Sequence, residues 1–244
     1  MSQVPNPFNA FGAQPQPLQY ESGADTITVP AFFNTVYAWM ATGLALTAVI
    51  AYVVSNNPSL MHTLFQSGII WLLFIAQIGL VIAISAAVKK ISSGVATVMF
   101  LVYAALNGLT LSVIFLAYTQ ASIAGAFFVT AGTFAAMSVY GFVTKRDLTA
   151  LGSMMFMALI GLIIASVVNI FWANSSLDWI ITYAGVLIFV GLTAYDTQKL
   201  KYIAMQTGHD REMSNRMAVN GALVLYLDFI NLFLMILRIM GKRR

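Results

Sequence analysis

Apolar residues occur in long runs separated by short polar breaks along most of the chain. The runs extend over residues 32–54, 68–88, 94–118, 123–143, 151–172, 179–200 and 217–240. Each run is close to the ~20 residues that a helix needs to cross a hydrocarbon core of ~30 Å. None shows the alternation that is typical of strands in a membrane β-barrel. The sequence therefore predicts an all-α polytopic membrane protein with seven transmembrane helices.

Composition supports this fold class and excludes an ordinary soluble domain. Hydrophobic residues make up 60% of the chain and charged residues only 8%. Soluble proteins are about a quarter charged, so this chain lacks the polar surface that a compact soluble fold requires. The chain also contains no cysteine, which excludes disulfides, cysteine-ligated zinc and thiolate catalysis.

Three regions follow from the distribution of polar residues. Residues 1–29 are rich in Pro, Gln, Asn and Gly, and the first 28 contain no Lys or Arg, so this region is predicted to be a disordered N-terminal tail rather than a secretory signal. Residues 30–241 form the predicted seven-helix transmembrane domain. Residues 242–244 form a basic C-terminal tail.

The basic residues predict the orientation of the helices. Eight of the twelve Lys and Arg residues fall in or beside the second, fourth and sixth connections, whereas the first, third and fifth connections contain none; the eight are Lys89, Lys90, Lys145, Arg146, Lys199, Lys201, Arg211 and Arg216. Cytoplasmic loops carry an excess of Lys and Arg. We therefore expect the N-terminus and the even-numbered connections to lie in the cytoplasm.

The last run leaves two alternatives open. Seven full spans from a cytoplasmic N-terminus would place the basic segment from Arg238 to Arg244 on the outer side, against the charge rule. Alternatively, the last segment could be re-entrant and return the tail to the cytoplasm.

Two acidic residues, Asp196 and Asp228, lie inside the apolar runs, while the other six lie in tails or connections. An ionised carboxylate at the centre of a bilayer costs at least ~2.5 kcal/mol, so each needs a partner, water or a proton. The simplest arrangement places the two facing each other. Asp228 lies about eleven residues, or ~16 Å, into the last run, so the sixth helix must continue past Leu200 to about Gln206 for the two to meet.

Such a pair has a functional and a structural interpretation. As a functional site, it would share a proton, titrate as a coupled unit, sense pH and hold a cation. As a structural feature, each Asp would bind polar or backbone groups and hold helices together. Tyr195, Tyr226 and Asn231 are the expected neighbours in the hydrogen-bond network, and Asn231 lies one turn from Asp228 on the same face.

Two segments around these aspartates resemble a known family. Residues 193–199 are TAYDTQK and residues 225–233 are LYLDFINLF. Together they resemble the Bax inhibitor-1 family in its bacterial form, and the resemblance covers the chain beyond the N-terminal tail. It implies a seven-helix fold with the last helix central, a pH-sensitive calcium leak and an aspartate pair that matches Asp196 and Asp228.

The resemblance also implies a cationic latch, in which an arginine at the cytoplasmic end of helix two pairs with the aspartates. That position corresponds to Lys90 here, with Lys89 beside it. Lys is a point charge and cannot form the bidentate contact that Arg forms with a carboxylate. Taken by itself, Lys90 is better explained as a lysine that extends to the interface and sets orientation than as a latch.

Three functions are compatible with these features. The first is a proton-gated cation leak in the cell (inner) membrane, with Asp196 and Asp228 holding Ca²⁺ transiently as the transported ion. The second is a regulator that binds another membrane protein, such as a quality-control protease, for which the N-terminal tail is the feature to test. The third is an intramembrane aspartyl protease, although residues 225–227 lack the glycines that precede the second aspartate in that family. We expect no enzymatic activity and no bound cofactor; the expected partners are the lipid bilayer, protons and Ca²⁺, without nucleic acid.

Overall fold

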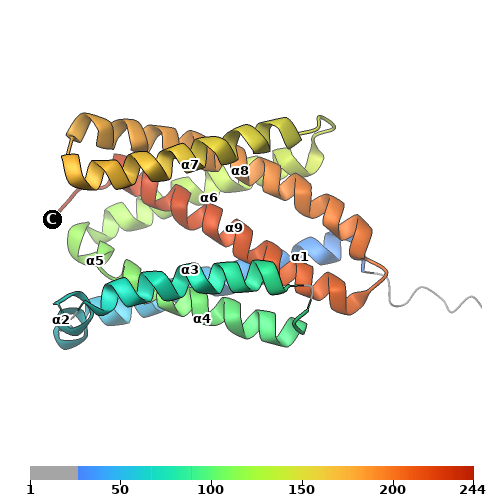
Figure 1. Ribbon diagram of the computed structural model, residues 1–244, viewed down its shortest axis with the longest axis horizontal. Coiled ribbons are helices and arrows are strands. Elements are labelled where there is room, and N and C mark those ends of the chain that lie inside the picture. Colours follow the sequence, from blue (N-terminus) through green and yellow to red (C-terminus); the bar gives the residue numbers. More distant parts are fainter. Residues whose placement is uncertain (1–26, 67, 89) are drawn as a thin grey trace, which may run out of the picture.

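The computed structural model describes residues 27–66, 68–88 and 90–244, most of which are helical (Figure 1). The predicted tail lies largely outside these residues, and the first helix, α1, begins at Val29 after the N-cap Thr28. The helices are α1 (Val29–Ser55), α2 (Pro58–Gln66), α3 (Ile69–Ala87), α4 (Ser93–Leu111), α5 (Ile114–Ala117), α6 (Gln120–Val143), α7 (Thr149–Trp172), α8 (Ser175–Thr207) and α9 (Arg211–Met240).

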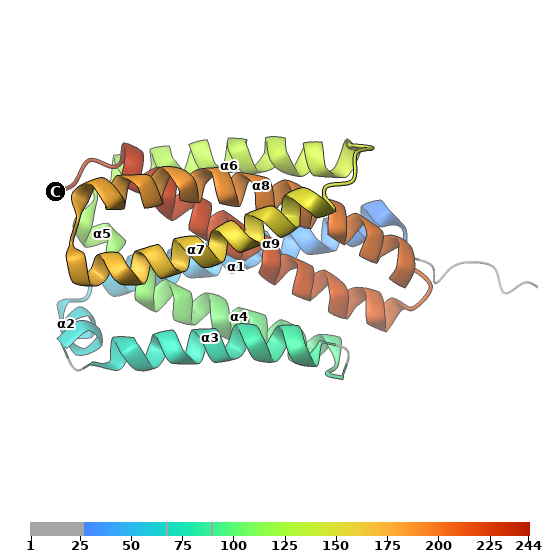
Figure 2. The same cartoon turned by 45° about the horizontal axis from the view of Figure 1, so that its top comes forward.

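The predicted seven spans are confirmed in the described part of the chain. Seven helical segments there are long and apolar enough to cross a membrane, and α4 together with α5 forms the third of them. The α7 and α3 segments have only 6% and 11% of their apolar windows buried within the protein. Both helices lie on the outside of the bundle (Figure 2). Their apolar surfaces therefore face lipid.

The first connection contains a helix, α2, that the apolar pattern did not predict. The sequence Asn57-Pro58 indicates a turn, and here it starts a nine-residue helix. The Asn57 side chain accepts a hydrogen bond from the Leu60 backbone N–H at 3.2 Å, and proline suits the first turn of a helix because it lacks an N–H. The helix was missed because it is too short and too polar to resemble a span.

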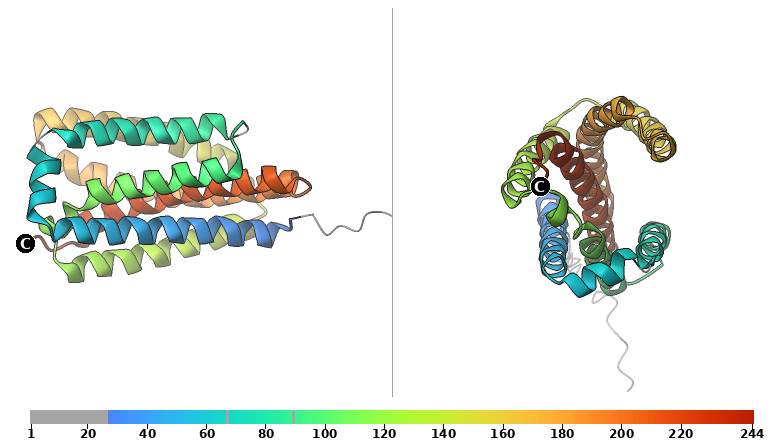
Figure 3. Two further views of the ribbon diagram at one scale, coloured as in Figure 1. Left: turned by 90° about the horizontal axis from the view of Figure 1, so that it is seen from below. Right: turned by 90° about the vertical axis from the view of Figure 1, so that its left-hand side faces the viewer.

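The last helix is central, as the family resemblance implies. α9 packs against α8, α1, α6 and α4, and it has the highest buried share of the seven spans. The end-on view in Figure 3 shows it surrounded by the other helices. Small residues permit this packing; a Cβ on Gly221, for example, would lie 2.6 Å from a methyl carbon of Leu200 on α8.

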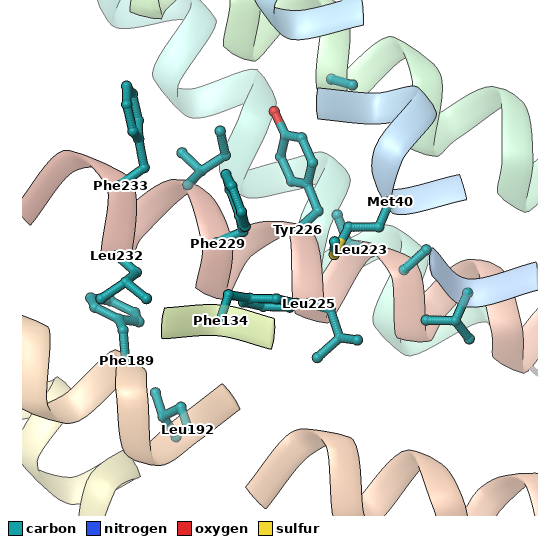
Figure 4. Close-up of a cluster of buried hydrophobic side chains, with 14 of the residues drawn as sticks. Met40, Phe134, Phe189, Leu192, Leu223, Leu225, Tyr226, Phe229, Leu232 and Phe233 are labelled. Carbon is teal, nitrogen blue, oxygen red and sulfur yellow. The ribbon is translucent and has the colours of Figure 1, made fainter. Parts of the chain in front are cut away.

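Aromatic rings fill the space around α9 (Figure 4). The Phe229 ring packs against Phe134 of α6 with ring centroids 5.5 Å apart. The Tyr226 ring contacts Phe100 and Tyr103 of α4 edge to face, at 5.8 and 5.9 Å. These contacts fix the rotation of α9 about its axis and therefore the direction in which each polar residue on it points.

The connections lie at two opposite ends of the bundle. At one end, which we call the basic end, lie the start of α1 and the α3–α4, α6–α7 and α8–α9 connections (Figure 1). At the other, the C-terminal end, lie α2, α5, the α7–α8 connection and the C-terminus. The even-numbered connections, which contain the basic residues, therefore share one end as predicted.

The re-entrant alternative for the last segment is wrong in this structure. α9 is one uninterrupted helix of 30 residues, and it ends at the C-terminal end of the bundle (Figures 1 and 3). The basic tail, residues 242–244, therefore lies with the connections that lack Lys and Arg. Close packing against α8, α1, α6 and α4 accounts for this path, because these contacts stabilise α9 as one continuous helix.

Candidate functional site

A cavity of about 550 Å³ lies between α7, α8 and α9, in the half of the bundle nearer the basic end. Apolar side chains such as Phe156, Phe189 and Leu192 form much of its wall. Its polar lining consists of Thr149, Ser153, Tyr195, Asp196, Lys199, Asp228 and Asn231. Both intramembrane aspartates thus face one cavity.

Asp228 is the more deeply buried of the two aspartates. Its side chain comes from the middle of α9, and the residue is only 5% exposed. Its Oδ2 atom is buried and accepts no hydrogen bond from the described residues. A buried carboxyl oxygen without a partner is costly, so this atom is available for a proton, a water molecule or a cation.

Asp196 faces Asp228 from α8 and is half-buried. The two carboxyl groups are close enough to interact directly. They meet because α8 continues for 33 residues to Thr207, well beyond the end of its apolar run. The extension that the sequence predicts to about Gln206 is therefore confirmed.

Among the described residues, Lys199 is the cationic side chain that lines the aspartate cavity, and sequence reasoning missed it. It lies one turn after Asp196, lines the same cavity and attracts the Asp196 carboxylate. Its Nζ atom also lies 5.9 Å from the centre of the Tyr195 ring. The spacing of three residues between Asp196 and Lys199 is the signal that indicates this proximity, because such residues are neighbours on a helix.

Tyr195 and Asn231, predicted to join the hydrogen-bond network of the aspartates, both line the cavity but make other contacts. The Tyr195 ring lies against Gly152 of α7, where a larger residue would force the ring or the helix to move. The Asn231 side-chain amide donates a hydrogen bond to the Leu227 carbonyl of its own helix at 2.9 Å. Within the described residues, neither side chain forms a hydrogen bond with an aspartate.

Tyr226 is not part of the aspartate site, which corrects the sequence-based expectation. Its ring points away from α8, toward α1 and α4 (Figure 4). Its hydroxyl lies 2.6 Å from Thr47 Oγ1 on α1. Residues two apart on a helix are separated by roughly 200° around the axis, so Tyr226 and Asp228 cannot face the same neighbour.

The lysines of the implied latch lie elsewhere or outside the described structure. Lys90 is exposed in the turn between α3 and α4, and it is not among the residues that line the cavity. Within the described residues, the ion pairs are Arg216–Glu212 and Arg238–Asp178, neither of which includes Lys90. Lys89 lies outside the described residues. The latch therefore stays a prediction.

The α6–α7 connection lies beside the cavity and is fixed by α8. The Gln198 side chain accepts from the Leu148 N–H at 2.9 Å and donates to the Arg146 carbonyl at 2.8 Å. Asp147 accepts from the N–H and the hydroxyl of Thr149, and these hydrogen bonds lower the pKa of its exposed carboxyl. An ionised carboxylate is favourable at this helix N-terminus.

The described residues contain no group of three or more His, Cys, Asp and Glu side chains that could hold a metal ion. The aspartate pair is thus not a closed metal site with a full set of protein ligands. It can hold a cation only with water or other oxygen atoms completing the coordination.

Seven helices of membrane-spanning length, the last of them central, define an all-α polytopic membrane protein. A family model described as "Inhibitor of apoptosis-promoting Bax1" matches residues 29–244 of this chain. The chain therefore belongs to the Bax inhibitor-1 family, as the motifs around Asp196 and Asp228 indicate.

Bacterial relatives support this assignment. The inner membrane protein YbhL of Escherichia coli is 52% identical over 229 residues, which cover 91% of this chain and 97% of the relative. A protein of Borreliella burgdorferi is 50% identical over 87% of this chain and 92% of its own length. A membrane protein of Streptococcus pyogenes is 39% identical over 86% of this chain and 92% of its own length.

Proposed function

We propose that this protein is a pH-sensitive cation leak, with Ca²⁺ as the ion, controlled by protonation of Asp196 and Asp228. The observation behind the proposal is the Asp228 carboxyl, which is buried inside the bundle and lies beside the Asp196 carboxyl in one cavity. One of its oxygens has no hydrogen-bond partner among the described residues. The family resemblance supports the same function.

The chemistry of two adjacent carboxylates explains the link between pH and the cation. Two ionised carboxylates repel each other in a poorly solvated site, and either a proton or a divalent cation relieves the repulsion. Ca²⁺ prefers oxygen ligands, so it competes with protons for the same atoms. Whichever ligand binds the closed and open states unequally shifts the equilibrium between them.

The packing beyond the cavity supports a gate toward the C-terminal end. There, α8 and α9 are in close contact, and a Cβ on Gly185 would lie 2.9 Å from the sulfur of Met235. Further along, Arg238 of α9 forms an ion pair with Asp178 of α8 at 3.1 Å. An ion that continues from the cavity between α8 and α9 would therefore require the two helices to separate in this half of the bundle.

The proposed location is the inner membrane, with the N-terminus in the cytoplasm. The Escherichia coli relative is named an inner membrane protein. The concentration of Lys and Arg at the basic end supports a cytoplasmic position for that end.

The test is Ca²⁺ flux into proteoliposomes from about pH 5 to about pH 8. We expect a pH-dependent flux in the unaltered protein and a flattened profile in Asp196→Asn and Asp228→Asn, because asparagine cannot exchange a proton. Asp147→Asn is the matched control, since asparagine can accept the same bonds from Thr149 and the site lies outside the cavity. A profile unchanged by both cavity substitutions would overturn the proposal.

The same assay shows which lysine, Lys199 or Lys90, acts on the aspartate pair. The geometry predicts that Lys199→Gln alters the pH profile, because Lys199 lines the cavity beside Asp196. The implied latch predicts an effect of Lys90→Gln. An effect of the second substitution alone would favour the latch over the contact seen here.

Two other functions have their own tests. For a regulator that binds another membrane protein, the N-terminal tail of residues 1–29 is the feature to test, and residues 1–26 of it lie outside the described structure. Loss of partner capture with unchanged flux after deletion of the tail would support a separate binding role. A protease would cleave a membrane substrate in a reaction that Asp228→Ala abolishes. Both stay predictions.

A further inference from the structure

A second hollow lies in the opposite half of the bundle from the aspartate cavity. It measures about 500 Å³, within the range of ligand sites, and is bounded by α1, α4, α5, α6 and α9. Its wall is almost entirely apolar, with Ala48, Ile123 and Phe233 among its residues. Phe127 and Phe128 on its border are 41% and 73% exposed, so the hollow is an open groove on the lipid-facing side.

The basic C-terminal tail is fixed at the rim of this groove. The Lys242 N–H donates to Ser122 Oγ at 2.9 Å, and the Lys242 carbonyl accepts from the Thr119 N–H at 3.2 Å. The Arg244 N–H donates to the Ala117 carbonyl at 3.1 Å. Gln120, between Thr119 and Ser122 at the start of α6, lines the groove itself. Backbone bonds therefore hold the tail within one helical turn of the groove.

Gly241 allows the tail to fold back in this way. A Cβ at this position would overlap the Leu237 carbonyl and the Tyr118 ring. A larger residue would therefore push the tail away from α5 and α6.

The side chains of the tail form no ion pair with the described residues. The Lys242, Arg243 and Arg244 residues are all exposed. Three cationic side chains thus lie at the interface end of an apolar groove, an arrangement that complements an anionic headgroup joined to an acyl chain.

We propose that this groove binds an anionic phospholipid, with its headgroup on Lys242, Arg243 and Arg244 and an acyl chain along α6. The groove residues of α6 extend from Gln120 to Phe128, about 12 Å at 1.5 Å per residue, which accommodates the headgroup-proximal part of an acyl chain. The site lies in the leaflet at the C-terminal end and is separate from the aspartate cavity.

Native mass spectrometry of the full chain in detergent tests this lipid site, with phosphatidylglycerol and phosphatidylcholine of identical acyl chains as probes. We expect phosphatidylglycerol to be retained at least tenfold better. Substitution of Lys242, Arg243 and Arg244 by Gln should remove that preference, because each cation near an anionic lipid contributes about fivefold to binding. The matched control is Gln at Lys145, Arg146 and Arg211, three exposed residues at the basic end.

A second pair of variants tests the acyl-chain groove. Ala124→Phe fills the groove and should lower retention of both lipids, whereas Ala136→Phe, an exposed position on α6 outside the groove, should not. Equal retention of the two lipids, or a preference that survives loss of the tail charges, would overturn the proposal. Full competition by glycerol phosphate, which lacks acyl chains, would also overturn it. A dimer that Ala124→Phe disrupts and Ala136→Phe does not would overturn it too, and would identify a second copy of the chain as the occupant.

Discussion

At the residue scale, α9 separates two polar systems on opposite faces. Asp228 points to the cavity shared with α8, whereas Tyr226 points to Thr47 on α1. Thr47 donates its hydroxyl hydrogen to the Ala104 carbonyl at 2.8 Å, so Tyr226 is the donor in the bond between the two hydroxyls. The Tyr226 bond thus joins α9 to α1, and the Thr47 bond joins α1 to α4. The Asp228 carboxyl on the other face remains available for chemistry.

Tyr226→Phe should therefore affect stability without affecting the pH response. The change removes one buried hydrogen bond and keeps the ring contacts with Phe100 and Tyr103. We expect the free energy of unfolding to fall by about 1 kcal/mol, measured by denaturant titration in detergent micelles. The pH profile of Ca²⁺ flux should match that of the unaltered protein. A flattened profile would show that Tyr226 acts on the aspartates after all.

At the element scale, the cavity depends on how closely α7 approaches α8. The Tyr195 ring of α8 occupies the space that a side chain at Gly152 would fill, and a Cβ there would lie 2.4 Å from a ring carbon. Gln198 fixes the adjoining α6–α7 connection. The α7–α8 contact thus positions the wall of the cavity opposite α9.

Gly152→Ala should loosen this contact. The added methyl group forces the Tyr195 ring or α7 to move, at a cost of about 1 to 3 kcal/mol in unfolding free energy. Gly161→Ala is the matched control on the same helix, because nothing lies within 4 Å of a Cβ built there. That control should be neutral or slightly stabilising, since alanine favours helix over glycine. Equal effects in thermal unfolding of the two variants would contradict the packing role of Gly152.

The sequence predicts features that depend on the bilayer, but not those that depend on how one helix is rotated against another. The seven spans follow from hydropathy, because the bilayer requires long apolar helices, and the extension of α8 follows from the need of Asp196 to reach Asp228. The direction of Tyr226 was not predictable from hydropathy, since it depends on how α9 is rotated against α1 and α4. The position of Lys199 beside the aspartates is not predictable from hydropathy either, because a lysine near the end of a span is equally able to extend into the interface, and its place in the cavity lining depends on how α8 packs against α7 and α9.

At the scale of the whole molecule, the path of α9 places the two ends of the bundle in different environments. The basic end carries the connections with Lys and Arg, and the C-terminal end carries the tail of residues 242–244. The tail therefore opposes the charge rule that orients the remaining chain. Two features favour this unfavourable location of the basic tail: its backbone hydrogen bonds to the region of α5 and α6, and the anionic lipid proposed to bind there.

Cysteine labelling tests this topology, and the absence of native cysteine makes single substitutions unambiguous. We choose three exposed positions: Ser176 in the first turn of α8, His209 between α8 and α9, and Arg244. In spheroplasts, a membrane-impermeant maleimide should label Ser176→Cys and Arg244→Cys, because both lie at the C-terminal end, whereas His209→Cys should react only after permeabilisation. Labelling of Arg244→Cys together with His209→Cys would mean that α9 does not cross the membrane, while labelling of His209→Cys alone would also invert the orientation. Only a fully spanning α9 with a cytoplasmic basic end gives the expected pattern at all three positions.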